Sequence, residues 1–304
     1  MAPLRFAIVG RGRMARTMRA LIGDVPYDEA EAIYIASRNG DHARHALAAL
    51  ADGKAVLCEK PFAMTLAEAD RIMSRAQQAR LLFMEAVATP FLPAVAFALA
   101  AAQSGRLGAT RHLEASFGYP IARSTHPRLF ERDGGVLADR AVYPLMLAVI
   151  ALGPVTAARI SVERDALGID IAARFQLDHD GGGRSDLAVS FVERLDNSMR
   201  IAGDAAVVEV APPLLGAQRV RLLAADSPSA SRRSRRMRQH GIVRRLADIG
   251  SRVAGRWHPH GTSPYIHEIE HFTALVRSGA SESPLITQAR MLAVTRLVDQ
   301  ARAS

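Results

Sequence analysis

The stretch RFAIVGRGRMA, residues 5–15, decides how the first part of the chain folds. Arg5–Val9 is an apolar run of strand length, and the turn Gly10–Ala15 joins it to a stretch with helical spacing that runs to about Leu21. A buried strand that passes through a glycine-rich turn directly into a helix is typical of a parallel, doubly wound sheet.

The turn itself fits the pattern G-x-G-x-x-A of a dinucleotide-binding site. Gly10 permits the tight turn, Gly12 lets the backbone approach a pyrophosphate, and the small Ala15 lets helix and strand pack closely. Arg13 and Met14 open the helix, whose N-terminus attracts negative charge. We therefore predict that these residues bind a dinucleotide; the alternative is a tight turn without a ligand.

Strand and helix patterns continue to alternate after this turn. Thr65 and Glu68 have the spacing of a capping box and so mark the start of one helix. Strands are predicted at residues 32–36, 55–58 and 81–87, and helices at 41–50 and 66–79. The alternation predicts a Rossmann-like parallel sheet domain over residues 1–92.

The pattern changes after Pro93, where strands follow one another with short turns such as residues 180–183. Strands are predicted at 110–117, 155–164, 169–178, 184–194, 198–210 and 218–224, and helices at 94–104, 135–152, 265–279 and 287–303. Consecutive strands predict a large, mainly antiparallel open sheet in an α+β domain over residues 93–304.

Composition places the chain among ordinary globular proteins. It has 304 residues, 49% of them apolar, and no apolar run approaches the roughly 20 residues that a membrane-spanning helix needs. We see no signal peptide, and Cys58 is the single cysteine, which fits a reducing compartment. We therefore expect a cytoplasmic protein with no membrane segment.

The positive charge is concentrated in one segment. The net charge is +9, and residues 231–256 hold nine arginines against one acid, Asp248. We interpret residues 226–260 as a basic insert and favour a solvated loop. The alternative is a patch for phosphate, nucleic acid or an anionic surface. Nucleic acid is the less favoured partner, because Trp257 is the only aromatic residue near the arginines.

Lysine is almost absent from the chain. Of 39 basic residues only Lys54 and Lys60 are lysines, and both lie in GKAVLCEKP, residues 53–61. A guanidinium stays protonated, whereas an ammonium can release a proton. Lys60 is therefore a candidate for a lysine kept for chemistry, although two lysines could also fall here by chance.

The end of the second predicted strand bears on the choice of cofactor. An acid that binds the adenosine ribose is expected there, but Glu29 and Glu31 lie before the strand, at its wrong end. Ser37 and Arg38 lie at the correct end and suit a 2′-phosphate. This favours NADP over NAD.

These motifs together resemble the Gfo/Idh/MocA family of NAD(P)-dependent oxidoreductases, and among its members those like dihydrodiol dehydrogenase. The combination of EKP with a later GG-x4-D-x3-Y spacing is specific. The matching pieces are GRGRMA (10–15), Asn39-x-x-His42, EKP (59–61), MEAVATPFLPA (84–94), HPRLFERDGGVLADRAVYP (126–144), and YIHEIEHFTALVRSG (265–279) followed by ESP.

The resemblance implies a role for several residues. Tyr143 would exchange a proton with the substrate oxygen, and the cation of Lys60 would lower the phenol pKa toward working pH. Asp139 would orient this pair. Glu59 and Pro61 would shape the strand end, Asn39 and His42 would line the nicotinamide side, and Arg128 would contact substrate. The resemblance implies no metal. Tyr143 as a core tyrosine, Asp139 as a structural partner of an arginine, and His42 as an exposed helix residue are the alternatives.

The chain also departs from the family. Ala32 follows Ala15 by only 17 positions, a gap too short for about three elements that family members have there. The strand that grips the adenosine ribose would be absent, and Arg5–Val9 would become a sheet edge with unpaired backbone groups. Pro90 replaces a usual arginine, and Arg140-Ala141 replaces a usual apolar-Gly pair.

We expect an oxidoreductase that transfers a hydride between NADP or NAD and a sugar, cyclitol or dihydrodiol-type hydroxyl or carbonyl. The small polyol or carbonyl substrate would be its ligand, and the second-domain sheet would pair subunits into a homo-oligomer. The alternative is a catalytically silent homologue that acts as a partner or scaffold protein.

Overall fold

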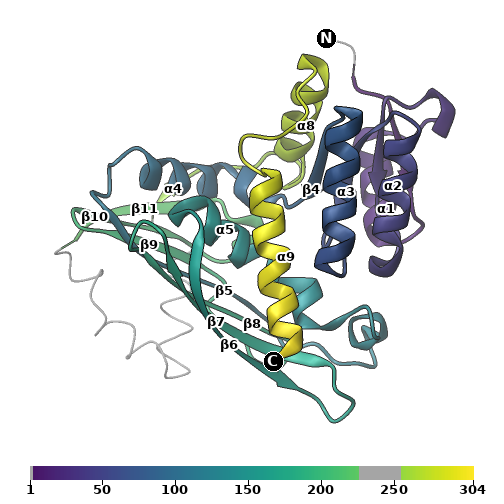
Figure 1. The fold of residues 1–304 in the computed structure, drawn as a ribbon. Helices are drawn as coiled ribbons and strands as arrows, with labels where there is room; N and C mark the ends of the chain where they lie inside the picture. The colour runs from purple at the N-terminus through teal and green to yellow at the C-terminus, as the bar shows by residue number, and fades with distance from the viewer. Residues whose placement is uncertain (1–2, 226–254) are drawn as a thin grey trace.

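The computed structural model describes residues 3–225 and 255–304. Within them the chain forms a four-stranded and an eight-stranded sheet, which lie side by side (Figure 1). The predicted fold class is thus confirmed. The described helices include none that is long and apolar enough to cross a membrane. Most of the predicted basic insert lies outside the described residues.

The first sheet is parallel and follows chain order. Its strands are β1 (Phe6–Val9), β2 (Ala32–Ile35), β3 (Ala55–Glu59) and β4 (Phe83–Ala86). The helices α1 (Arg13–Ile22), α2 (His42–Ala51) and α3 (Leu66–Ala79) connect them. The side chains of β2 and β4 are all buried, as expected for a parallel sheet covered on both faces.

The capping box at α3 differs in one detail from its prediction. The Thr65 hydroxyl accepts a hydrogen bond from the Glu68 N–H at 3.2 Å, as expected. The Glu68 carboxylate, however, accepts from the N–H of Met64 at 2.8 Å, one residue before the cap. The first bond satisfies an N–H group that the first turn of a helix leaves open, and the second satisfies an N–H group just before the helix.

The strand β1 lies at the edge of its sheet, but the prediction that its backbone groups are unpaired is wrong. The N–H of Ile8 donates to Asp24 Oδ1 at 2.9 Å, and the N–H of Val25 donates to the Phe6 carbonyl at 2.9 Å. The Arg19 guanidinium donates to the carbonyls of Ile8 and Gly10, each at 3.0 Å. The segment that follows α1 therefore closes this edge.

The second sheet is mixed and has the order β12-β11-β10-β9-β5-β8-β7-β6. Only the β5–β8 pair is parallel. The strands are β5 (Thr110–Gly118), β6 (Val155–Arg164), β7 (Asp170–His179), β8 (Arg184–Ser190), β9 (Met199–Gly203), β10 (Ala206–Val210), β11 (Arg219–Ala224) and β12 (Arg256–Trp257).

Two strands of this sheet begin or end at residues other than those predicted. The strand expected at 198–210 is the hairpin β9–β10, because the chain reverses after Gly203 and Ala202 pairs with Val207. The strand expected at 184–194 ends at Ser190, whose hydroxyl accepts from the N–H groups of Val192 and Glu193. Both changes are tight turns that hydrophobic alternation does not reveal.

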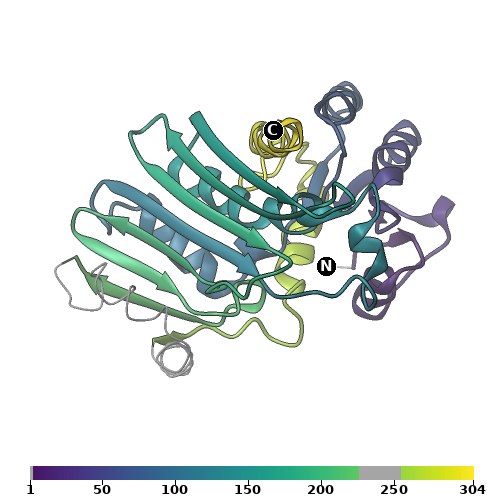
Figure 2. The ribbon, with the colours of Figure 1, turned by 90° about the horizontal axis from the view of Figure 1, so that it is seen from below.

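Helices cover one face of the large sheet (Figures 1 and 2). They include α4 (Pro93–Gln103), α5 (Val142–Leu152) and α9 (Gln288–Ala303), while α8 (Ile266–Ser278) reaches the small sheet, where Phe272 contacts Phe6. A π-helical turn at Leu137–Ala141 leads into α5. A domain boundary between residues 92 and 93 stays a prediction.

Candidate active site

A cavity of about 760 Å³ opens where the strands of the small sheet end. Ala36 and Ser37 follow β2, Glu59 and Lys60 close β3, and Ala86 ends β4. In open parallel sheets the carboxyl ends of the strands are where ligands bind. The opposite wall comes from the second part of the chain, so residues far apart in the sequence meet here.

Most of the predicted site residues line this cavity. They are Arg13, Met14, Ser37, Asn39, His42, Glu59, Lys60, Arg128, Asp139 and Tyr143. Gly10, Gly12, Ala15, Arg38 and Pro61 do not line it. The structure thus brings the expected lysine, aspartate and tyrosine together, although they come from β3 and from the π-helical turn and helix α5.

The glycine turn has the geometry that its pattern predicts. Gly10 has φ +134°, and a Cβ there would lie 2.2 Å from the Ala36 carbonyl oxygen. A Cβ at Gly12 would meet no atom within 4 Å, so space is open beside this backbone. Ala15 is fully buried. Gly10 is therefore required by the protein's own packing, whereas Gly12 leaves room for a ligand.

Lys60 is held between Asp139 and Tyr143. Its Nζ donates to the Asp139 carboxylate at 2.9 Å and to the Asp139 carbonyl at 2.6 Å. The same ammonium lies 5.1 Å from the centroid of the Tyr143 ring. Burial by itself lowers the pKa of Lys60, but the charges of Asp139, Tyr143 and Glu59 raise it above its ordinary value. The lysine is thus a stable cation at neutral pH.

The expectation that Lys60 lowers the phenol pKa toward working pH is wrong. Burial raises the pKa of Tyr143, the charge of Lys60 lowers it, and Glu59 and Asp139 raise it again, with the net shift upward. The Tyr143 ring packs edge-on against Phe117, with centroids 5.7 Å apart. Its hydroxyl forms no hydrogen bond with another described residue, so this neutral phenol is open to a ligand.

Asn39 and His42 line the cavity from the start of α2. The Asn39 amide donates to the Asp133 carbonyl at 2.9 Å. His42 is 1% exposed, so its interpretation as an exposed helix residue is wrong. Its Nδ1 lies 2.8 Å from the Pro61 carbonyl, and burial lowers the pKa of His42. The neutral ring therefore fixes the turn after β3.

Arg38, which was predicted to meet a 2′-phosphate, is bonded to acids of the protein. Its guanidinium pairs with the carboxylates of Glu131 and Asp133. The Ser37 hydroxyl lies 2.9 Å from Nδ1 of His45. Both groups that were expected to meet a 2′-phosphate are bonded within the protein. The basis for favouring NADP is thereby lost, and the cofactor preference is not determined.

Sequence reasoning missed a group of buried acids and tyrosines beneath the cavity. The Tyr34 hydroxyl donates to Glu59. Glu85 and Glu268 are 2% and 1% exposed, and each has a carboxylate oxygen without a partner among the described residues. Burial raises the pKa of Glu85 to about 7 and that of Glu268 well above its usual range. The sequence did contain a signal for these buried acids: Glu85 lies within an apolar strand, and Glu268 lies on the apolar face of a helix.

Arg140, which departs from the family pattern, is also buried at this site. It is 3% exposed, donates to the carbonyls of Tyr119 and Ser190, and lies over the rings of Phe117 and Phe191. Its Nε is 3.6 Å from the Asp139 carboxylate. The guanidinium therefore ties the turn that carries Asp139 to the large sheet.

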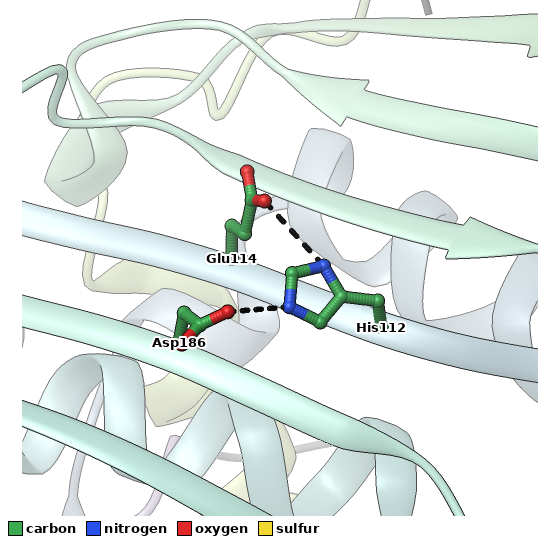
Figure 3. A group of neighbouring side chains, drawn as sticks. All are labelled: His112, Glu114 and Asp186. Atoms are coloured by element: carbon green, nitrogen blue, oxygen red, sulfur yellow. Dashed lines mark hydrogen bonds and ion pairs between the residues drawn. The ribbon is translucent and has the colours of Figure 1, made fainter. Parts of the chain in front are cut away.

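A second polar cluster lies on the large sheet, on the face opposite the one that helices α4, α5 and α9 cover. His112 stands between Glu114 and Asp186, with Nδ1 3.4 Å from Glu114 Oε1 and Nε2 2.7 Å from Asp186 Oδ2 (Figure 3). Each of these residues offers one atom that could bind a metal ion, and the three atoms lie within 4.8 Å of one another. Exposed acidic groups commonly lie together without an ion, and the contacts seen here are those of a polar network.

Two family models match the chain. One is described as an oxidoreductase family with an NAD-binding Rossmann fold and matches residues 18–87. The other is described as the GFO/IDH/MocA C-terminal domain and matches residues 95–209. The first match begins after the glycine turn.

Curated relatives resemble the chain over part of their length. Trans-1,2-dihydrobenzene-1,2-diol dehydrogenase from Sus scrofa is 30% identical over 185 residues, which cover 60% of this chain and 55% of that protein. The enzyme of the same name from Homo sapiens is 30% identical over 187 residues, with 60% and 55% covered. The chain thus spans little more than half of the length of these relatives.

Solved structures share the whole architecture. An aldose-aldose oxidoreductase from Caulobacter crescentus, complexed with glycerol, superposes with a TM-score of 0.79 at 19% identity. The superposition covers 99% of this chain and 98% of that one. At this identity the likeness establishes the fold alone.

Proposed function

The chain belongs to the Gfo/Idh/MocA family of oxidoreductases, and on that premise we propose that it is an NAD(P)-dependent oxidoreductase acting on CH–OH groups. The observation that carries the proposal is the cluster of Lys60, Asp139 and Tyr143 at the strand ends, with the Tyr143 hydroxyl open to the cavity. A phenol without a hydrogen bond, with a cation beside it, can move a proton to or from a substrate oxygen.

The residues around the glycine turn fit the nicotinamide and phosphate part of a dinucleotide. Gly12 leaves open space, α1 has no acid in its first turn, and Arg13 and Met14 line the cavity. When bound, the nicotinamide would supply or accept the hydride at the substrate carbon. We assign the pyrophosphate to the start of α1 and the nicotinamide side to Asn39, His42 and the end of β3.

The protein's own groups would handle the proton. We assign Tyr143 as the group that gives its hydroxyl proton to a substrate carbonyl oxygen, because its raised pKa keeps it protonated at neutral pH. Lys60 would stabilise the negative charge that develops on that oxygen. Asp139 is a positioning residue, since it holds the ammonium at 2.9 Å. This arrangement favours reduction of a carbonyl at neutral pH.

The substrate class that we propose is a sugar, cyclitol or dihydrodiol with a hydroxyl or carbonyl at the reacting carbon. The cavity wall opposite the sheet combines apolar Phe117 and Ile121 with polar Thr125 and with Arg128, the proposed substrate contact. An apolar floor with a few polar groups suits a small cyclic polyol. The curated relatives carry a dihydrodiol in their names.

Turnover tests this proposal directly. Purified protein would be screened with NADH and NADPH against small aldoses, cyclitols and diketones, and the loss of reduced nicotinamide absorbance would be followed. We expect Tyr143→Phe to lower kcat by about 10²- to 10⁴-fold and Lys60→Ala to abolish turnover. Tyr27→Phe is the matched control, because Tyr27 bonds only to Asp52 at the surface, and it keeps wild-type rates.

The silent-homologue alternative makes the opposite prediction. If wild-type protein binds NADH but turns over no substrate, the chain is a binding protein of this fold. If turnover is found and survives in Lys60→Ala, the assignment of the site is overturned.

We also propose a homo-oligomer that forms through the face of the large sheet that the described helices leave uncovered. Helices cover the other face, and Leu222 and Trp257, on β11 and β12, are exposed by 40% and 54%. Light scattering of the purified chain would give the mass directly. A monomer at micromolar concentration would contradict this proposal.

A further inference from the structure

The small sheet holds only one of the two halves that a dinucleotide needs. A doubly wound sheet binds a dinucleotide across two mononucleotide-binding halves, with strand order 3-2-1-4-5-6, and the adenosine ribose is gripped at the end of the strand beside the first. Here the order is β1-β2-β3-β4, with β1 at the edge. The strand that would carry the ribose contact is not among the described residues.

The space next to β1 is also closed to a further strand. Asp24 accepts the outward N–H of Ile8, and Val25 donates to the Phe6 carbonyl. Arg19 bonds to the carbonyls of Ile8 and Gly10 and to Asp24, the last at 2.6 Å. The backbone groups that would pair with the missing strand are thus occupied by the chain itself.

The charged groups at the two ends of β2 are bonded within the protein. Arg38 is paired with Glu131 and Asp133. Glu31, near the start of β2, accepts from Arg277 at 2.6 Å, and these hydrogen bonds lower the pKa of Glu31 to about 2. No uncommitted acid or arginine thus stands at the strand end in the described part of the chain.

The proposed phosphate position at the start of α1, by contrast, is surrounded by positive charge. Arg11, Arg13 and Arg16 are exposed around the start of α1, and no acid lies in its first turn. Gly12 is the N-cap of α1, no side chain caps the first N–H groups of the helix, and a Cβ at Gly12 would meet no atom within 4 Å.

From this contrast we infer that recognition of the cofactor ends at the phosphate: the chain binds a nicotinamide ribotide, and the adenosine part of NADH or NADPH adds no affinity. The inference rests on the proposed function, since it takes the nicotinamide side of the cavity as given. It follows that the protein does not distinguish NADH from NADPH and that reduced nicotinamide mononucleotide replaces both.

Calorimetric titration of the full chain tests this without any turnover. NADH, NADPH and reduced nicotinamide mononucleotide would each be titrated, and adenosine, which lacks a phosphate, would be tested as a competitor. We expect three dissociation constants within about threefold of one another, which is less than 0.7 kcal/mol, and no displacement by adenosine. Arg13→Ala weakens all three ligands by the same factor, about tenfold. Arg71→Ala, an exposed arginine of α3, is the matched control and changes none.

The outcomes separate the two proposals. If the mononucleotide binds thirtyfold or more weakly than NADH or NADPH, or if adenosine displaces either, the inference is overturned while the oxidoreductase proposal stands. If none of the three binds at millimolar concentration, both fail. A preference of tenfold or more between NADH and NADPH also overturns the inference, because it requires a contact to the adenosine ribose.

Discussion

Removal of the Asp24 carboxylate is expected to open the edge of the small sheet. In Asp24→Ala the N–H of Ile8 loses its acceptor at 2.9 Å, and Arg19 loses its ion pair at 2.6 Å. A hydrogen bond to a charged group contributes about 1.5–3 kcal/mol, and a partly exposed ion pair adds at most about 1 kcal/mol. We therefore expect the free energy of unfolding to fall by about 2–3 kcal/mol.

Urea unfolding of wild type and variants gives this quantity. Asp24→Asn keeps an oxygen acceptor for Ile8 but loses the charge toward Arg19, so it should lose about half as much as Asp24→Ala. Asp70→Ala, which removes an exposed acid of α3, is the control and should stay within about 0.5 kcal/mol of wild type. An exposed edge also pairs with other chains, so Asp24→Ala should aggregate more readily.

Surface substitutions usually change the free energy of unfolding by less than about 0.5 kcal/mol. If Asp24→Ala lowers it by no more than this, the reasoning is refuted. The closing segment would then contribute nothing to stability.

Three further outcomes are expected. The rate of alcohol oxidation should rise with pH through the alkaline range while carbonyl reduction stays level, because the raised pKa of Tyr143 keeps the phenol protonated; an oxidation rate that levels off near pH 7 contradicts this. The folded pKa of Glu85, about 7, is above its unfolded value, so the folded state gains from the bound proton at low pH and loses this stability as pH rises from about 4.5 to 7. Glu85→Gln, in which the amide oxygen can still accept from Phe62, should remove up to about 3 kcal/mol of that dependence, as urea unfolding at pH 5 and pH 8 would show. Gly10→Ala should fail to fold or lose all cofactor binding, because its Cβ would lie 2.2 Å from the Ala36 carbonyl; a circular dichroism spectrum and calorimetry matching wild type would contradict this.

Much of the fold was predictable because the relevant signals are local. The alternation of apolar strands with helices gave the parallel sheet, and Thr65 marked the start of α3. The hairpin β9–β10 was missed, although Gly203 and Asp204, at the reversal between the strands, are residues that favour turns. Local pattern thus located elements well and located tight turns poorly.

The site was predictable in composition but not in electrostatics. Lys60, Asp139 and Tyr143 were correctly brought together, since the family motifs fix their positions. The direction of the phenol pKa was wrong, because burial outweighs one neighbouring cation and depends on every element packed around the ring. The ion pairs of Arg38 were missed for the same reason: its partners Glu131 and Asp133 lie more than 90 positions away.

The sequence by itself determined the two sheets, the family, the position of the lysine and the shortness of the segment between Ala15 and Ala32, since spacing and periodicity are properties of the chain. Only the tertiary structure decided how the protein accommodates that shortness. Arg19 and Val25 donate hydrogen bonds to the edge of β1, and Asp24 accepts one from it. Such bonds depend on where side chains and loops lie in space, and no local pattern in the sequence specifies that.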